Sequence, residues 1–215
     1  MMEIITLVLG PVETNTYIVA DPATEEAVVI DPAWDGEQIA RRASQRDWTI
    51  RQIWLTHAHF DHLAGAAGIV RQVVPAPPVA LHPQDLPLWS RGGGAAMFGM
   101  QVDPGPRPSI LLAERQVLQI GNLSFEVLYA PGHTPGHVLF YSAAEKVVFC
   151  GDVVFAGSIG RTDLPGGNYH QLLESIRTRI LSLPDETRLL SGHGPESTVG
   201  KEKRSNPFLT DLCVR

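Results

Sequence analysis

The chain has 215 residues, of which 44% are hydrophobic and 19% are charged, and its formal net charge is -6. This composition is typical of a globular protein and excludes a disordered chain, and the length predicts one domain over residues 1–215. The acidic balance and the lack of a dense run of lysine and arginine exclude nucleic-acid binding through a basic face.

Short β-branched runs bounded by Gly, Pro, Asn or Asp predict strands at 3–9, 16–20, 27–31, 50–55 and 78–81. Helical spacing of apolar residues predicts helices over 35–46 and 62–74, and a turn or short helix broken by proline over 83–90. The second half has a similar succession of strands and helices. Strands are expected at 116–120, 123–129, 137–142, 146–150 and 187–191, and a helix at 168–182. Strands in runs, separated by helices in both halves, predict two sheets with helices outside them.

The segment 90–109 is rich in glycine and proline and is expected to be a long irregular loop. Two interpretations stay open, a mobile surface excursion and a lid that borders a site. Met97, Phe98 and Met100 are unusual choices for a solvated loop, so they are candidates for the lining of an apolar pocket.

No apolar run is long enough to span a membrane, and the N-terminus lacks the pattern of a signal peptide. Cys150 and Cys213 lie far apart and outside any CxxC pattern. We therefore expect no disulfide, no membrane partner and a cytoplasmic location. Cys150, within an apolar strand, is expected to be a small buried side chain.

The motif HxHxDH follows the strand predicted at 50–55 and gathers His57, His59, Asp61 and His62. On extended backbone, residues two apart point to the same side, so His57 and His59 face one way. Imidazole and carboxylate ligands suit zinc, iron and manganese. Because one metal rarely takes four ligands this close in sequence, we expect them to be divided between two metal ions.

Three further candidate ligands lie in glycine-flanked turns after apolar strands, namely His133, Asp152 and His193. Glycine lets the backbone turn sharply and approach a metal closely. With HxHxDH, these residues predict a metal centre built from the ends of four strands. His82 and His170 lack this setting and are expected to be structural or surface residues.

The segments THAHFDH, APGHTPGH, CGD and SGHGP, in this order, resemble the motifs of the metallo-β-lactamase fold superfamily over nearly the whole chain. The resemblance implies a protein of the α/β class, an αββα sandwich of two mixed sheets flanked by helices, with the metal centre at one edge of the sheets. NTYIVAD, VVIDP, GSIGRTDLPGG and NPFL are similar to the short, single-domain branch of the glyoxalase II-like hydrolases (hydroxyacylglutathione hydrolases).

This resemblance implies two divalent metal ions, with zinc expected and iron or manganese as the alternatives. The implied ligands are His57, His59 and His133 for the first metal, and Asp61, His62 and His193 for the second, with Asp152 bridging both. A hydroxide held between the ions would attack a carbonyl carbon. The implied catalytic role of Asp61 is to orient that hydroxide or to accept its proton.

Two residues behind the ligands are also implicated. Asp31, in VVIDP, matches an acid that orients a ligand in the family, and its alternative role is that of an aspartate in a turn at the end of a strand. His137 begins the strand after His133 and is expected to hydrogen-bond behind the ligands rather than to bind metal.

The substrate site departs from two-domain glyoxalase II enzymes. The segment after His193 is too short for their helical extension, and Gly194 replaces their tyrosine. Arg161 matches a basic position that binds the glutathione moiety, with an ion pair to Asp163 as the alternative. A patch of Lys201, Lys203 and Arg204 is a substitute carboxylate-binding site, or else a solvated tail.

Three functions compete. The first is a thioester hydrolase with a small-molecule substrate, and S-D-lactoylglutathione, a glutathione conjugate, is the leading candidate. The second is a persulfide dioxygenase with one iron on His57, His133 and Asp152; the absence of an aromatic residue and a glutamine after GRTD favours the hydrolase. The third is a metal-stabilised binding module without catalysis. Lactonase or β-lactamase activity is a lesser variant of the first.

Overall fold

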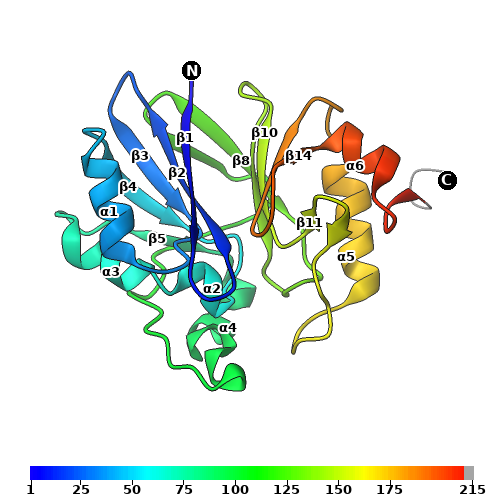
Figure 1. The fold of residues 1–215 in the computed structure, drawn as a ribbon, viewed down its shortest axis with the longest axis horizontal. Coiled ribbons are helices and arrows are strands. Elements are labelled where there is room, and N and C mark those ends of the chain that lie inside the picture. Colours follow the sequence, from blue (N-terminus) through cyan, green and yellow to red (C-terminus); the bar gives the residue numbers. More distant parts are fainter. Residues whose placement is uncertain (211–215) are drawn as a thin grey trace.

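The structure is a computed structural model that describes residues 1–210, so Cys213 and its expected lack of a disulfide lie outside the described residues. Two six-stranded sheets pack face to face, with helices on both outer faces (Figure 1). The predicted αββα sandwich of two mixed sheets is confirmed. No helix in the described range is long and apolar enough to cross a membrane.

The first sheet comes from the N-terminal half of the chain. In spatial order it contains β1 (Glu3–Leu9), β2 (Thr14–Asp21), β3 (Glu26–Ile30), β4 (Thr49–Trp54), β5 (Val79–Leu81) and β6 (Ile110–Leu111). The first three strands are antiparallel, and β3 to β6 are parallel. Helices α1 (Gly36–Ser44) and α3 (Ala66–Gln72) lie on its outer face, on the left of Figure 1.

The second sheet comes from the C-terminal half. Its spatial order is β14 (Ser197–Thr198), β13 (Arg188–Ser191), β10 (Val147–Gly151), β9 (Val138–Ser142), β8 (Leu123–Tyr129) and β7 (Val117–Ile120). Only β10 and β13 pair in parallel. Helix α5 (Tyr169–Ser175), the π-helical turn η3 (Ile176–Ile180) and α6 (Val199–Ser205) lie beside it, on the right of Figure 1.

Strands β2, β3 and β10 are buried on both faces, which explains their nearly continuous apolar sequences, whereas β1 and β7 have exposed residues. In β2, Ile18 packs toward the helices of the first layer, whereas Tyr17 and Val19 face the second sheet. Between the sheets, the Trp54 ring meets the Phe125 ring edge-on, with 5.2 Å between the ring centroids. The sandwich is thus a rigid frame for the loops at the ends of its strands.

The short elements gather at one end of the sandwich. They are α2 (Phe60–Leu63), the 3₁₀ turn η1 (Pro83–Asp85), α4 (Leu86–Trp89), the 3₁₀ segment η2 (Gly92–Phe98), and the hairpin of β11 (Val154–Phe155) and β12 (Ser158–Ile159). Figure 1 shows α2 and α4 below the first sheet. These elements carry or cover the residues expected to bind metal.

Two expectations about local structure were wrong. The helix expected over 62–74 begins at Phe60 and is interrupted at Gly65, whose amide donates to the Pro32 carbonyl at 2.8 Å instead of continuing the helix. The loop 90–109 contains the helical segment η2. The short strands β6, β11, β12 and β14 and helix α6 were not predicted; the Thr198 side chain caps α6 by accepting a hydrogen bond from the Lys201 amide.

Candidate metal centre

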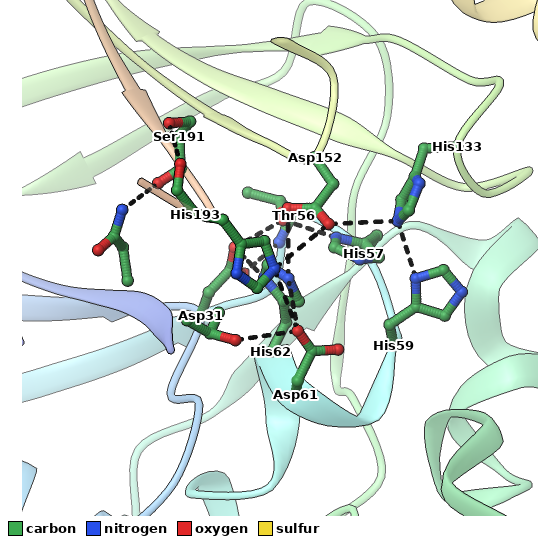
Figure 2. Close-up of polar contacts among 12 residues, drawn as sticks. Asp31, Thr56, His57, His59, Asp61, His62, His133, Asp152, Ser191 and His193 are labelled. Carbon is green, nitrogen blue, oxygen red and sulfur yellow. Dashed lines mark hydrogen bonds and ion pairs between the residues drawn. The ribbon is translucent and has the colours of Figure 1, made fainter. Parts of the chain in front are cut away.

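Each residue expected to bind metal lies just beyond the end of a strand. The HxHxDH segment follows β4, and the other candidates follow β8, β10 and β13. Figure 2 shows these side chains, from both sheets, pointing toward one another. The last residues of β4, β10 and β13 are buried, so the frame holds candidate ligands that are distant in sequence at short range.

The first cluster consists of three imidazoles. One nitrogen from each of His57, His59 and His133 lies within 4.8 Å of the others. Nδ1 of His59 is 2.8 Å from Nε2 of His133, although the residues are 74 positions apart. All three rings are buried. This is the ligand group that the family resemblance implies for the first metal.

The second cluster combines one carboxylate with two imidazoles. Ligand atoms of Asp61, His62 and His193 lie within 4.8 Å of one another. Oδ2 of Asp61 is 3.3 Å from Nε2 of His62 and 3.3 Å from Nε2 of His193. This is the group implied for the second metal, and it borders the first because His62 and His57 are in ring contact, with centroids 4.1 Å apart.

Asp152 lies between the two clusters. Its Oδ1 is 3.4 Å from Nε2 of His62, and its Oδ2 is 3.5 Å from Nε2 of His133 and 3.6 Å from Nε2 of His193. One carboxylate therefore faces histidines of both clusters (Figure 2). This is the placement that a bridging ligand requires.

Asp31 and His137 lie behind the ligands. The Asp31 carboxylate accepts hydrogen bonds from the backbone amide and the hydroxyl of Thr56, each at 2.7 Å, and its Oδ2 is 3.0 Å from Nδ1 of His62. Nε2 of His137 accepts from the Asp152 amide at 3.1 Å, and its ring stacks on His57. Asp31 thus contacts the ring of the candidate ligand His62, and His137 contacts the backbone of Asp152 and the ring of His57. Their roles in orienting metal ligands stay predictions.

Two imidazoles of the first cluster, those of His57 and His59, are held neutral. Burial lowers the pKa of His57, and its neighbour His62 adds to the effect. Burial, assisted by His133, lowers the pKa of His59 to about 3. Burial likewise lowers the pKa of His137. Neutral imidazole keeps the nitrogen lone pair that a metal ion needs.

The second cluster favours positive charge. Burial opposes a charge on His62, but Asp61, Asp152 and Asp31 outweigh it and raise its pKa well above the usual value. Burial also opposes a charge on His193, whose pKa is nevertheless raised by Asp61 and Asp152. Burial alone would raise the pKa values of Asp61 and Asp152, yet His62 holds both far below their usual range. Converging carboxylates of this kind suit a cation.

Buried polar atoms without hydrogen bonds test whether the site fits metal ions. Among the described residues, Nε2 of His57, Nε2 of His62 and Oδ1 of Asp152 are buried and make no hydrogen bond. A buried polar atom left unpaired costs about 1–3 kcal/mol. These atoms are lone-pair donors that point into one centre, so the residues fit a pair of divalent metal ions.

Two glycines, Gly192 and Gly151, allow the backbone to lie close to the side chains of the candidate metal centre. A Cβ at Gly192 would collide with the Asp152 carboxylate and lie 2.6 Å from a ring carbon of His62. Gly151 has a φ of +45°, and its Cβ would lie 2.5 Å from the Thr56 hydroxyl. A side chain at either position would push the ligands apart, as the glycine-flanked turns in the sequence indicate.

Asp85 is a site residue that the sequence reasoning missed. Its buried carboxylate accepts from the Ala58 amide at 3.0 Å, the Thr134 hydroxyl at 2.7 Å and the Gly136 amide at 2.6 Å. It thereby joins the loop of the first two ligands to the loop of His133. No pattern marks it, because LHPQD reads as an ordinary proline turn.

Thr14 is a second missed residue. Its hydroxyl donates to Oδ2 of Asp61 at 2.9 Å, across a separation of 47 residues. Thr14 directly precedes the NTYIVAD segment of β2, one of the segments on which the family resemblance rests. That neighbouring segment was the only sequence signal that could have pointed to Thr14. Thr14 holds one face of the Asp61 carboxylate.

A pocket of about 200 Å³ opens onto the metal centre. Its lining combines candidate ligands with other side chains: His59, Asp61, His133, Asp152, His193, Val12, Phe60, Phe98, Met100, Leu164 and Arg161. Arg161 thus lies at the expected place, and it also makes the alternative contact, a two-pronged ion pair with Asp163 at 2.7 Å for each bond. Lys201, Lys203 and Arg204 are not part of this lining, and Lys203 pairs with Asp185.

The remaining histidines lie apart from the centre. His82 caps η1 and stacks on the Tyr129 ring, with centroids 4.7 Å apart. His170 is exposed on α5. Cys150 is buried in β10, where burial raises the pKa of its thiol. All three have the settings expected from the sequence.

Comparison with known proteins identifies the family. The model of the metallo-beta-lactamase superfamily matches residues 9–193, a range that includes every candidate ligand. The chain belongs to the metallo-beta-lactamase superfamily. Within it, the chain is 40% identical to the hydroxyacylglutathione hydrolase GloC of Haemophilus influenzae over 187 residues, 86% of this chain and 88% of GloC.

Two solved structures are similar to this protein over almost the whole chain. BLEG-1, a B3 metallo-beta-lactamase, superposes with a TM-score of 0.90 at 38% identity, covering 98% of this chain and all of BLEG-1. TTHA1623, solved in a di-iron-bound form, superposes with a TM-score of 0.87 at 42% identity, covering 95% of this chain and all of TTHA1623. A solved neighbour of comparable length therefore has a di-iron-bound form.

Proposed function

We propose that this protein is a hydrolase that uses two divalent metal ions, zinc first among the candidates, to cleave a thioester. S-D-lactoylglutathione is the candidate substrate that the family resemblance suggests first. The observation that carries the proposal is the position of Asp152, whose two oxygens lie within 3.6 Å of histidines from both clusters. The relationship to GloC supports the thioester, and the di-iron form of TTHA1623 supports the pair of metals.

The residues that would hold the ions divide as the two clusters do. His57, His59 and His133 would hold the first, and Asp61, His62 and His193 the second, with Asp152 shared. When bound, the ions would supply Lewis-acid chemistry, activating a water molecule near neutral pH and stabilising negative charge on the carbonyl oxygen.

Asp61 is the candidate catalytic residue of the chain itself. Its carboxylate lines the pocket and is fixed by the Thr14 hydroxyl and by His62 and His193. Burial opposes its charge, but His62 holds its pKa far below the usual range, so the carboxylate remains ionised. An ionised, strongly stabilised carboxylate is a weak base. Asp61 therefore acts by accepting a hydrogen bond from the attacking water and orienting it.

The leaving group needs little help from the chain. A thiolate is a stable leaving group, so a general acid is not required, and none of the described lining residues has the raised carboxyl pKa of such an acid. Arg161 lies in the pocket lining, about half exposed, and would contact a carboxylate of a glutathione conjugate. Its pair with Asp163 weakens that contact by sharing the charge.

A paired assay separates this function from its competitors. The purified holoenzyme is tested for hydrolysis of S-D-lactoylglutathione, for oxygen uptake with glutathione persulfide and for cleavage of a β-lactam, and its metal content is measured by elemental analysis. The proposal predicts thioester hydrolysis with two metal ions per chain. One iron per chain with persulfide-dependent oxygen uptake, or β-lactam cleavage without thioester cleavage, would overturn it.

A further inference from the structure

The pocket at the metal centre has an apolar wall. Five of its lining side chains are apolar: Val12, Phe60, Phe98, Met100 and Leu164. Phe60 lies between two candidate ligands in sequence, so the apolar surface reaches the place where the scissile carbonyl must lie. Arg161, the one lysine or arginine among the described lining residues, is already paired with Asp163. Selection in this pocket therefore rests on apolar contact more than on charge.

The segment that supplies Phe98 and Met100 is fastened to the metal site. Gly93 has a φ of +65°, and a Cβ there would lie 2.5 Å from Cα of Phe60 and 2.7 Å from the Ala58 carbonyl. The backbone of η2 thus packs directly on the backbone of the HxHxDH loop. At the far side, the Trp89 indole donates to the Pro104 carbonyl at 3.1 Å and closes the loop.

This anchoring holds Phe98 against the pocket despite its exposure. The Phe98 and Phe60 rings lie 5.4 Å apart at an interplanar angle of 45°, a favourable aromatic contact. Even so, 49% of Phe98 remains exposed. An aromatic side chain held at the mouth of a site with half of its surface in water gains free energy when an apolar group covers it.

Pocket size decides which end of a thioester enters. The pocket holds about 200 Å³, less than the roughly 300–1,000 Å³ of pockets for drug-sized ligands. A tripeptide thiol is far larger than this space, whereas an acyl group of a few carbons fits. We infer that the apolar wall binds the acyl group, so that the protein prefers thioesters of short apolar acyl chains to the hydroxylated lactoyl thioester.

This inference rests on the thioester hydrolysis proposed above and assigns its substrate class. S-Propionylglutathione and S-D-lactoylglutathione form a matched pair, because they differ by one hydroxyl group. The wall offers that hydroxyl no partner, and burying an unpaired hydroxyl is unfavourable. The holoenzyme should therefore have the higher kcat/KM for the propionyl thioester.

The test measures kcat/KM along a series of S-acylglutathiones, from acetyl through propionyl to butanoyl, in three forms of the protein. The wild type should gain about threefold for each added methylene. Phe98→Ala should flatten this gain. Met97→Ala is the matched control, since Met97 is 61% exposed, neighbours Phe98 and is not part of the described pocket lining, and it should keep the gain.

The gain is a ratio within one variant, so a smaller folded fraction does not alter it. Met100→Ala supplies a second, independent perturbation of the same wall. A flat or falling series in the wild type, or a full gain in both Phe98→Ala and Met100→Ala, would overturn the inference. A gain that follows the size of an apolar thiol instead of the acyl chain would also overturn it. Absence of hydrolysis for every thioester is a different result and counts against the proposed function itself.

Discussion

Asp85 is not a candidate metal ligand, but removal of its carboxylate should destabilise the loops that carry three candidate ligands. The carboxylate is fully buried and accepts from three donors on the two loops that carry His57, His59 and His133. Asp85→Ala leaves the amides of Ala58 and Gly136 and the hydroxyl of Thr134 without an acceptor in a space closed to water.

The expected magnitude follows from those three donors. Each buried donor left unpaired costs about 1–3 kcal/mol. Burial raises the pKa of Asp85, so its removal also relieves the cost of burying a carboxylate, and the lower end of the range applies. We expect the free energy of unfolding of the metal-free protein to fall by about 3 kcal/mol, that is, about 1 kcal/mol per donor.

Urea denaturation of metal-free protein measures this loss. Asp103→Ala is the matched control. The exposed Asp103 carboxylate accepts from the Gly105 amide and forms a long, exposed ion pair with Arg71, so its loss should change stability by less than about 0.5 kcal/mol. Asp85→Asn keeps the side-chain volume and one acceptor oxygen, so a smaller but clear loss there identifies the missing acceptor rather than a cavity as the cause.

A second readout tests the connection to the metals. Residues that hold ligands in place typically change metal affinity about 10–100-fold when they are replaced. We expect a weakening in this range for Asp85→Ala, measured by competition with a chelator. A stability loss no larger than that of Asp103→Ala, together with unchanged metal affinity, would refute the reasoning.

Three further predictions follow from the same geometry. Asp152→Ala removes the carboxylate that faces histidines of both clusters, so elemental analysis should find both metals depleted; depletion of one alone would exclude a bridging role. Asp163→Asn frees the Arg161 guanidinium, so KM for an anionic glutathione thioester should fall about threefold at low salt, and an equal fall for an uncharged thioester would contradict a charge effect. Protein with free metal at about 1,000 times Kd should have a free energy of unfolding about 4 kcal/mol higher than protein whose metal a chelator has removed. An unchanged melting temperature after metal removal would contradict the assignment of these residues as metal ligands.

The longer strands and the candidate ligands were predictable because both depend on local sequence. Long apolar β-branched runs ended close to the ends of the strands, and each ligand candidate stood in the segment that followed, whereas the two-residue strands β6, β11, β12 and β14 gave no such signal. The division of the candidates into two groups came from the family resemblance, and the fold brings the ligand atoms of each group within 4.8 Å of one another. The roles of these residues in binding metal stay predictions.

Contacts between distant segments were not predictable in this way. The break in the helix at Gly65 depends on a hydrogen bond to Pro32, and the anchoring of η2 depends on Gly93 meeting Phe60. Asp85 resembles any turn aspartate until the fold closes Thr134 and Gly136 around it. In each case the decisive partner lies more than 30 residues away, where periodicity carries no information.

The central claim is that two metal ions, held by two clusters that share Asp152, are both needed for thioester hydrolysis. Stepwise return of zinc to the metal-free protein, followed by hydrolysis of an S-acylglutathione, tests it most directly. The account predicts that the rate reaches its plateau at two equivalents of zinc per chain. A plateau at one equivalent would contradict it.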